Sequence, residues 1–449
     1  MSVIDHVPPA RSATVEPVAD VIRAVVQNGS LREIEVAWPD HSGHVLGKRI
    51  PAAGFLERAP GGFPFCDAAL TWSITGECQE GARLTDWQTG YPDMIAVPRL
   101  STFSWLPWRE GAGQVLADLV DHRGELVRTA PRTVLRRVTD RLAGIGLTAQ
   151  VGVELEFYLL RPDGSPLAEA IHCYSLQKSN DLDPAFGAIV DAVGRFVAVE
   201  GSNSEYGPGQ LEINLAHAGP LEAADQGMRL KYAVRELARR AGMLATFMAK
   251  PLTGESGSSM HLHLSLWRDG EPVFAPAAAG ENPLMRHAIG GVLRHLPGIT
   301  VYGAPTVNSA KRYQEHSFAP TSASWGGDNR TAAVRSLIES PAATRLELRT
   351  GGADANPYWA VAALLAAAVA GVEDEVEPPA RGVGNLYGAG GPLPATLAEA
   401  VSAARADARI GEILGADAVH DMTTVAYAEW RAYISEVTAW ERDRYLRLA

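Results

Sequence analysis

The stretch Val151–Leu160, VGVELEFYLL, decides the fold. Its apolar and polar residues alternate with a period of two, which predicts a β-strand. The polar face of this strand presents Glu154 and Glu156. The apolar face carries Val153, Leu155 and Phe157. Two carboxylates side by side repel each other more strongly as water is withdrawn, so we expect positive charge between them.

Three later stretches repeat this alternation, each with one apolar face and one face of charged or metal-binding residues. They are Gln210–Leu215 (QLEINL), Met260–Leu266 (MHLHLSL) and Arg345–Arg349 (RLELR). Their polar faces carry Gln210, Glu212, Asn214, His261, His263, Ser265, Arg345, Glu347 and Arg349. Solvation explains one such face, but four faces of these residue types favour a single sheet that packs on helices and lines a site.

The residue types on these faces favour divalent cations and phosphate. Carboxylates with one or two imidazoles and no thiol suit Mg²⁺ or Mn²⁺. Arginines beside bound cations suit phosphate oxygens, which they bind bidentately. The sequence therefore predicts phosphoryl transfer from a nucleotide.

Eight blocks of sequence match a known pattern in order along the chain. They are Glu154–Glu156, Glu205–Glu212, Gly257–His263, Asn308–Arg312, Asp328–Arg330, Val334–Arg335, Arg345–Arg349 and Ala355–Tyr358. Through them nearly the whole chain resembles the glutamine synthetase family. The resemblance implies an α+β fold, with a β-grasp N-terminal domain and a catalytic domain whose antiparallel sheet forms a funnel backed by helices. We expect a flexible arm at residues 1–14, the β-grasp domain at 15–108 and the catalytic domain, binding ATP, metals and glutamate, at 109–449.

The resemblance also implies two or three Mg²⁺ or Mn²⁺ ions in the funnel. The metal nearest the acceptor would be held by Glu156, Glu205 and Glu212. The metal on the nucleotide phosphates would be held by Glu154, His261 and Glu347. A lone strand histidine is more often structural, but the pairing of His261 with two glutamates in the matched family favours a ligand.

Further roles follow from the same resemblance. Catalysis would use Arg330, Arg335 and Glu205, the arginines by neutralising the phosphoryl group in transfer. ATP would contact His263, Ser265, Arg335 and Arg345. The substrate glutamate would contact Gly257, Arg312, Arg330 and Arg349.

ATP is needed because a carboxylate does not react with an amine at neutral pH. Its leaving group is poor and its carbon is electron-rich. Transfer of the γ-phosphoryl group of ATP to the γ-carboxylate of glutamate gives an acyl phosphate, which an amine can attack. Such a transfer requires neutralisation of the moving charge by metals and arginines.

Two positions depart from the pattern of the ammonium-using synthetases. Their FDGSS loop corresponds here to FCDAALTW, residues 65–72, which keeps the carboxylate of Asp67 but not the GSS. Their catalytic flap glutamate corresponds to Phe318, while Glu315 lies three residues earlier. A phenylalanine cannot accept a proton, but it packs on an alkyl chain. We therefore expect a primary amine as the acceptor, bordered by Asp67 and Phe318.

Three functions fit the sequence. We favour a γ-glutamyl amide ligase that joins glutamate to a polyamine, ethanolamine or another primary amine. A glutamine synthetase using ammonium would need Asp67 or Glu315 to replace the lost groups. A non-catalytic regulatory paralogue is disfavoured, because all six expected metal ligands are present. The sequence does not name the amine.

Composition and charge restrict the partners of the 449-residue chain. The formal net charge of −12 argues against nucleic acid and anionic membranes. The apolar stretch Ala360–Val372 is shorter than the ~20 residues that span a bilayer, so it predicts a buried helix. Three cysteines without ligand spacing, and an N-terminus unlike a signal peptide, predict a cytoplasmic protein.

The resemblance implies two further properties. The family assembles as homododecamers of two stacked hexameric rings, so we expect that state here. Tyr387 falls where some bacterial relatives are adenylylated. Because its flanking sequence is glycine-rich, with GAGG at residues 388–391, we expect Tyr387 to be an unmodified structural residue.

Overall fold

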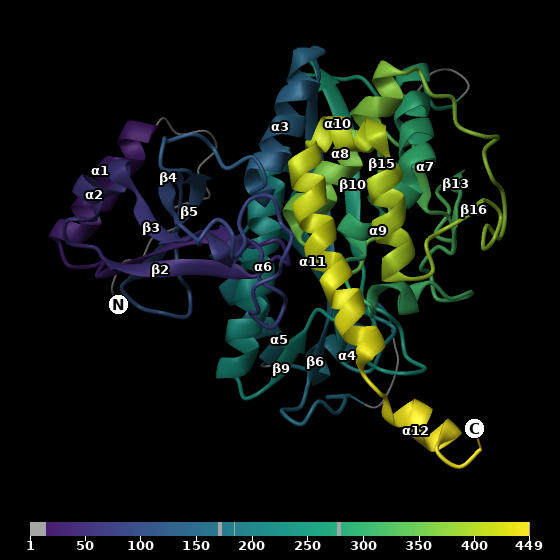
Figure 1. Ribbon diagram of the computed structural model, residues 1–449, viewed down its shortest axis with the longest axis horizontal. Coiled ribbons are helices and arrows are strands. Elements are labelled where there is room, and N and C mark those ends of the chain that lie inside the picture. The colour runs from purple at the N-terminus through teal and green to yellow at the C-terminus, as the bar shows by residue number, and fades with distance from the viewer. Residues whose placement is uncertain (1–14, 169–172, 184, 276–279, 449) are drawn as a thin grey trace.

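The computed structural model describes residues 15–168, 173–183, 185–275 and 280–448. The chain forms two lobes, a smaller N-terminal lobe and a larger catalytic lobe (Figure 1). Each lobe combines its own sheet with helices, which confirms the predicted α+β class. The predicted arm at residues 1–14 lies outside the described residues.

Among the described residues, the N-terminal sheet has five strands in the order β2-β1-β5-β4-β3. β1 and β5 pair in parallel, and the other neighbours pair antiparallel. The strands are β1 (Glu33–Pro39), β2 (Val45–Pro51), β3 (Phe63–Cys66), β4 (Asp93–Trp105) and β5 (Ala112–Val120). Helices α1 (Val15–Gln27) and α2 (Phe55–Arg58) accompany them. The lobe has a separate hydrophobic core, built on Ile22, Ile34, Val36, Phe55 and Val115.

The predicted domain boundary at residue 108 falls before β5. This strand lies between β1 and β4 and bridges them, so the N-terminal sheet extends to Val120. Its pairing partners are distant in sequence, and a composition-based boundary does not detect such pairing.

In the part of the chain that the structure describes, the catalytic sheet has nine strands, seven of them in the order β13-β14-β15-β10-β6-β8-β7. The four strands predicted from alternation are β15, β10, β6 and β8, and they are neighbours in this order. The strands are β6 (Thr148–Leu160), β7 (Val199–Ser204), β8 (Gln210–Leu215), β9 (Leu244–Thr246), β10 (Met260–Arg268), β11 (Glu271–Pro272), β13 (Trp325–Gly327), β14 (Val334–Leu337) and β15 (Arg345–Leu348). A separate pair joins β12 (Ser322–Ala323) to β16 (Gly391–Pro392).

Long helices cover the apolar face of this sheet. Each begins with a proline in its first turn, where the missing N–H costs no helical hydrogen bond. They are α3 (Pro131–Gly144), α6 (Pro220–Arg240), α7 (Pro283–Gly303) and α8 (Pro357–Glu373). The remaining helices are α4 (Leu176–Asp181), α5 (Ala185–Val193), α9 (Leu397–Ala406), α10 (Ala408–Leu414), α11 (Ala416–Ser435) and α12 (Ala439–Tyr445).

Helix α8 contains the alanine-rich stretch and lies inside the catalytic lobe. Every residue from Pro357 to Gly371 is buried, which confirms the predicted buried helix. In the described ranges, no helix has the length and apolar character needed to cross a membrane.

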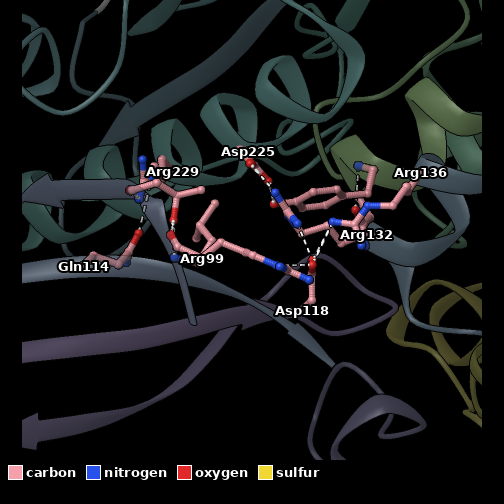
Figure 2. Close-up of polar contacts among 11 residues, drawn as sticks. Arg99, Gln114, Asp118, Arg132, Arg136, Asp225 and Arg229 are labelled. Atoms are coloured by element: carbon pink, nitrogen blue, oxygen red, sulfur yellow. Dashed lines mark hydrogen bonds and ion pairs between the residues drawn. The ribbon is translucent and has the colours of Figure 1, made fainter. Parts of the chain in front are cut away.

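A buried ionic network joins the two lobes (Figure 2). Asp118 on β5 is 1% exposed and accepts hydrogen bonds from Arg99 of β4 and from Arg132 and Arg136 of α3. The arginines of α3 are four residues apart, so they lie on one face of that helix. Arg132 also donates through Nε to Asp225 of α6, at 3.0 Å. The position of the N-terminal lobe therefore depends on charges in the catalytic lobe.

Helix α6 contributes a second arginine to this contact. The sequence predicts a helix at 221–245 whose arginines face solvent, and this is wrong for Arg229. Its side chain is buried and donates through Nε to Gln114 of β5 at 3.0 Å (Figure 2). The N-terminal lobe covers this face of α6, which the helical periodicity alone cannot reveal.

Candidate functional site

Strand register gathers the first group of predicted metal ligands. His261 on β10 lies opposite Glu154 on β6, and His263 on β10 lies opposite Glu347 on β15. The Nδ1 atom of His261 is 3.4 Å from Oε2 of Glu154 and 3.8 Å from Oε1 of Glu347. The Nε2 atom of His263 is 3.0 Å from Oε1 of Glu154. The Nε2 atom of His261 is buried without a hydrogen-bond partner among the described residues, as suits a metal ligand.

The second group consists of three glutamates, of which Glu156 and Glu212 are buried and Glu205 is partly buried. Glu156 on β6 lies opposite Glu212 on β8, and Glu205 immediately follows β7. Burial, reinforced by the charge of Glu156, raises the pKa of Glu212 to about 8. Burial and the charge of Glu205 raise the pKa of Glu156 to about 7, and burial and the charge of Glu212 raise that of Glu205 to about 7. A cation would relieve this shared repulsion, so the donor set fits a divalent metal.

The geometry divides the ligands differently from the resemblance. Two sets have ligand atoms that all lie within 4.8 Å of one another, one of Glu154, Glu212 and His261 and the other of Glu154, His263 and Glu347. The carboxylates of the other two glutamates, Glu156 and Glu205, instead accept hydrogen bonds from neighbouring N–H groups. Glu156 accepts from the backbone of Ser259 at 2.8 Å. Glu205 accepts from Asn203 at 2.9 Å.

The carboxylates of the first group have the opposite electrostatics. Burial alone would raise the pKa of Glu154, but hydrogen bonds with His261 and His263 hold it well below its usual range. Burial also acts against ionisation of Glu347, yet Arg349 beside it brings its pKa to about 2. The carboxylates of Glu154 and Glu347 are thus paired with positive or hydrogen-bonding partners. Those of Glu156, Glu205 and Glu212 mainly repel one another.

We expect the metal-free protein to lose stability as pH rises from about 5 to 8. The native state binds more protons than the unfolded chain in this window, because Glu156, Glu205 and Glu212 have raised pKa values. Glu154 and Glu347 are ionised in both states there and contribute no slope.

A bound cation replaces these protons, so the stabilisation by a fixed Mn²⁺ concentration should grow over the same range. Thermal melts from pH 5.5 to 8.5, with and without Mn²⁺, measure both effects. The Glu212→Gln variant should show a shallower pH slope. A Mn²⁺ stabilisation of equal size at every pH would contradict the assignment.

Arginines approach the charge-paired side of the site. Arg335 on β14 lies opposite Glu347 and donates to its Oε2 at 3.1 Å. Arg349 donates to Oε1 of the same glutamate at 2.5 Å. Arg345 donates through Nε to Nδ1 of His263 at 3.2 Å. The residues expected around the nucleotide phosphates therefore lie together, while Ser265 is further along β10.

The expected glutamate-binding residues are only partly brought together. Arg312 is 2% exposed and donates to the carbonyl oxygen of Thr350 at 3.2 Å. A Cβ atom on Gly257 would lie 2.6 Å from Cγ of Arg312, so only glycine allows this close approach. Arg330 instead lies exposed after β13, where it lines an open pocket with Arg381. The described geometry leaves Arg330 outside the carboxylate cluster.

The two expected acceptor residues lie in different lobes. Asp67 follows β3 in the N-terminal lobe, which Figure 1 shows apart from the catalytic sheet. It is 3% exposed and accepts a hydrogen bond from Thr85 at 2.6 Å. Burial raises the pKa of this carboxyl group. One chain therefore does not bring Asp67 to Phe318.

Sequence reasoning missed an aromatic partner of Phe318. The ring of Tyr206 stacks on that of Phe318, with centroids 5.6 Å apart and an interplanar angle of 24°. Tyr206 directly follows Glu205, which is the signal that could have drawn attention to it. Tyr387 is also close, since its hydroxyl oxygen accepts from the backbone N–H of Phe318 at 2.7 Å. Its unmodified state remains a prediction.

Comparison with known proteins shows the family to which the chain belongs. Residues 128–445 match the model of the glutamine synthetase catalytic domain. The chain is 32% identical to a glutamate–isopropylamine ligase from a Pseudomonas species, covering 95% of this chain and 97% of that one. It is 35% identical to the γ-glutamylethanolamide synthetase GlnA4 of Streptomyces coelicolor, covering 94% of each chain.

A solved structure shows the same architecture. Ligand-free GmaS superposes with a TM-score of 0.84 at 31% identity, covering 94% of this chain and 99% of that one. The match spans both lobes of the fold. The chain is therefore a member of the glutamine synthetase family, a carbon–nitrogen ligase that resembles the γ-glutamyl amine ligases within it.

Proposed function

We propose that the enzyme uses ATP to join the γ-carboxylate of glutamate to a primary amine, releasing ADP and phosphate. One observation carries the proposal. A set of acidic, imidazole and arginine side chains lies on the catalytic sheet, while the flap carries the uncharged Phe318, stacked on Tyr206. Relatives named for isopropylamine and ethanolamide products support it.

The acidic and imidazole side chains would bind cations, and the arginines would bind phosphate and carboxylate groups. Divalent cations, when bound by the glutamates and histidines of the site, would neutralise the phosphates of ATP and of the acyl phosphate. Arg335, beside Glu347, faces the phosphoryl group in transfer. Arg312 and Arg349 bind the carboxylates of glutamate, and their burial strengthens these ion pairs.

The amine must lose a proton before or during its attack. Glu205 directly precedes Tyr206, so it is the site carboxylate closest in sequence to the aromatic pair. We assign to it the acceptance of this proton, at a carboxylate oxygen. Glu315 is exposed, and Asp67 lies in the other lobe of the same chain.

An amine panel tests the proposal. The enzyme is incubated with ATP, glutamate and Mg²⁺, together with ammonium, methylamine, isopropylamine, ethanolamine or putrescine, and phosphate release and product mass are measured. We expect a γ-glutamylamide to form faster with at least one amine than glutamine forms with ammonium. Activity with ammonium alone would support glutamine synthetase, and no activity with any acceptor would support a non-catalytic paralogue.

Substitution of Phe318 by glutamate should shift acceptor use toward ammonium. The change removes an apolar contact worth a factor of about four in affinity per methylene and introduces a carboxylate. Use of alkylamines should weaken, ammonium use should stay equal or rise, and the KM for ATP should stay within about twofold, since Phe318 makes no phosphate contact. Steady-state kinetics check this. Unchanged amine kinetics would remove Phe318 from the acceptor site.

We further propose a homododecamer of two stacked hexameric rings. The C-terminal segment supports self-association, because it leaves large apolar side chains in water. Figure 1 shows α12 projecting from the body of the molecule, and none of its residues is buried. The exposed side chains include Ile434, Val437, Trp440 and Leu446. Light scattering should report a mass near twelve chains, and a fully active monomer would contradict this state.

We also propose a cytoplasmic location, where ATP and glutamate are available. The three cysteines, Cys66, Cys78 and Cys173, are all unpaired, as expected in a reducing compartment. Fractionation of cells that produce the enzyme tests this, and recovery outside the cytoplasm would contradict it.

A further inference from the structure

Two aromatic side chains form an exposed pair beside the acidic side of the site. Tyr206 and Phe318 are each 43% exposed, although their rings stack on each other. Tyr206 directly follows Glu205. Large apolar rings left open to solvent beside buried carboxylates offer a surface on which an apolar group can pack.

The backbone of Phe318 is held in a conformation that non-glycine residues rarely adopt. Its φ is 59°, in the left-handed region. Its N–H donates to the hydroxyl of Tyr387 at 2.7 Å, and its carbonyl oxygen accepts from Nη2 of Arg349 at 3.4 Å. Contacts on both sides of the residue therefore maintain this conformation and fix the direction of the ring. Such retained strain is typical of functional positions.

The turn that carries Tyr206 is equally constrained. A Cβ atom on the next residue, Gly207, would lie 1.8 Å from the hydroxyl oxygen of Tyr158, so the backbone rests directly on that side chain. The Tyr158 hydroxyl in turn donates to the carbonyl oxygen of Ser256 at 2.7 Å. The backbone that carries each ring is thus held by neighbouring side chains, as expected of the wall of a preformed binding pocket.

The charges around the pair disfavour a second ammonium group. The charged side chain in hydrogen-bond contact with Phe318 is Arg349, a cation. An alkyl chain packed on these rings would extend past a guanidinium and a neutral tyrosine hydroxyl. Glu205, the carboxylate next to Tyr206, is assigned above to the reacting nitrogen. A distal ammonium beside Arg349 would therefore be repelled and would lose hydration.

We propose that Tyr206 and Phe318 form the wall of the amine pocket and select a primary monoamine with a short uncharged alkyl chain over a diamine. This inference rests on the proposed ligase function and makes it more specific. Tyr387 serves as a positioning residue, since it acts on the amine through the backbone of Phe318.

A matched pair of acceptors tests the selection. n-Pentylamine and 1,4-diaminobutane have equal numbers of non-hydrogen atoms and differ in whether the far end is a methyl or an ammonium group. We expect kcat/KM to be at least about tenfold higher for n-pentylamine. From methylamine to n-propylamine, kcat/KM should rise about two- to fourfold per methylene.

Substitutions of Tyr206 and Phe318 test whether these two rings cause the dependence of kcat/KM on the length of the alkyl chain. Tyr206→Ala and Phe318→Ala should flatten the rise per methylene, because they should lower kcat/KM more for n-propylamine than for methylamine. Tyr206→Phe keeps the ring and should retain the rise. Trp105→Ala serves as the control, because Trp105 is exposed and stacks edge-on against another aromatic ring, that of Phe103 on β4.

The outcomes separate the two claims. A wild-type enzyme that uses only ammonium overturns the proposed ligase function and this inference with it. A wild-type enzyme that uses alkylamines but prefers 1,4-diaminobutane to n-pentylamine overturns the inference alone. The same holds if Tyr206→Phe loses the rise per methylene, or if Phe318→Ala retains it.

Discussion

Replacement of Glu212 by alanine should abolish turnover, lowering kcat by more than about 100-fold. Loss of residues that merely support metal ligands already costs ten- to 100-fold, so loss of a ligand should cost at least as much. Glu212 lies opposite Glu156 on the neighbouring strand, and its ligand atoms lie within 4.8 Å of those of Glu154 and His261. It therefore borders both groups of carboxylates.

The measurement is the initial rate of phosphate release at saturating ATP, glutamate, amine and Mn²⁺. Glu222→Ala is the matched control, since this glutamate is exposed in the first turn of α6 and should retain full activity. Circular dichroism should show that Glu212→Ala remains folded. Activity within tenfold of wild type at saturating Mn²⁺ would contradict the metal assignment.

Replacement of Asp118 by alanine should produce the largest loss of stability, about 3–5 kcal/mol. The carboxylate is 1% exposed and accepts hydrogen bonds from three arginines, of which Arg132 is also buried. Burial acts to raise the pKa of Asp118, but these arginines lower it below its usual value. Its removal leaves three cations close together at the junction of the lobes.

Urea unfolding of the variant and the wild type in matched buffers measures this loss. The control is Asp20→Ala, because the pair between Asp20 and Arg23 is exposed and such pairs contribute at most about 1 kcal/mol. If Asp118→Ala destabilised the protein no more than Asp20→Ala, the network would not hold the lobes together.

The central part of the fold could be predicted because its signal is local. Alternation with a period of two identified β6, β8, β10 and β15, and the face on which each glutamate and histidine lies. If the polar faces of β6 and β10 line one site, Glu154 and His261 are expected to lie on the same face of the sheet, and in the structure they are directly opposite each other. Pro131 and Gly144 likewise mark the ends of α3 in the sequence and in the structure.

The remaining features depend on contacts between distant residues. β5 joins the N-terminal sheet through partners on both sides, so no local pattern places it there. Arg229 looks like a solvent-facing residue of an amphipathic helix until the other lobe covers it. The stacking of Tyr206 on Phe318 arises where the turn before β8 meets the flap, and neither segment alone predicts it.

The transfer of ¹⁸O from glutamate to phosphate tests the proposed reaction most directly. Glutamate labelled with ¹⁸O in its γ-carboxylate is incubated with enzyme, ATP, Mg²⁺ and isopropylamine, and phosphate and product are analysed by mass spectrometry. Phosphorylation of the carboxylate followed by attack of the amine expels phosphate that retains one carboxylate oxygen. We expect one ¹⁸O in phosphate for each γ-glutamylamide formed. Unlabelled phosphate, or labelled phosphate without amide, would contradict ATP-driven ligation of glutamate to an amine.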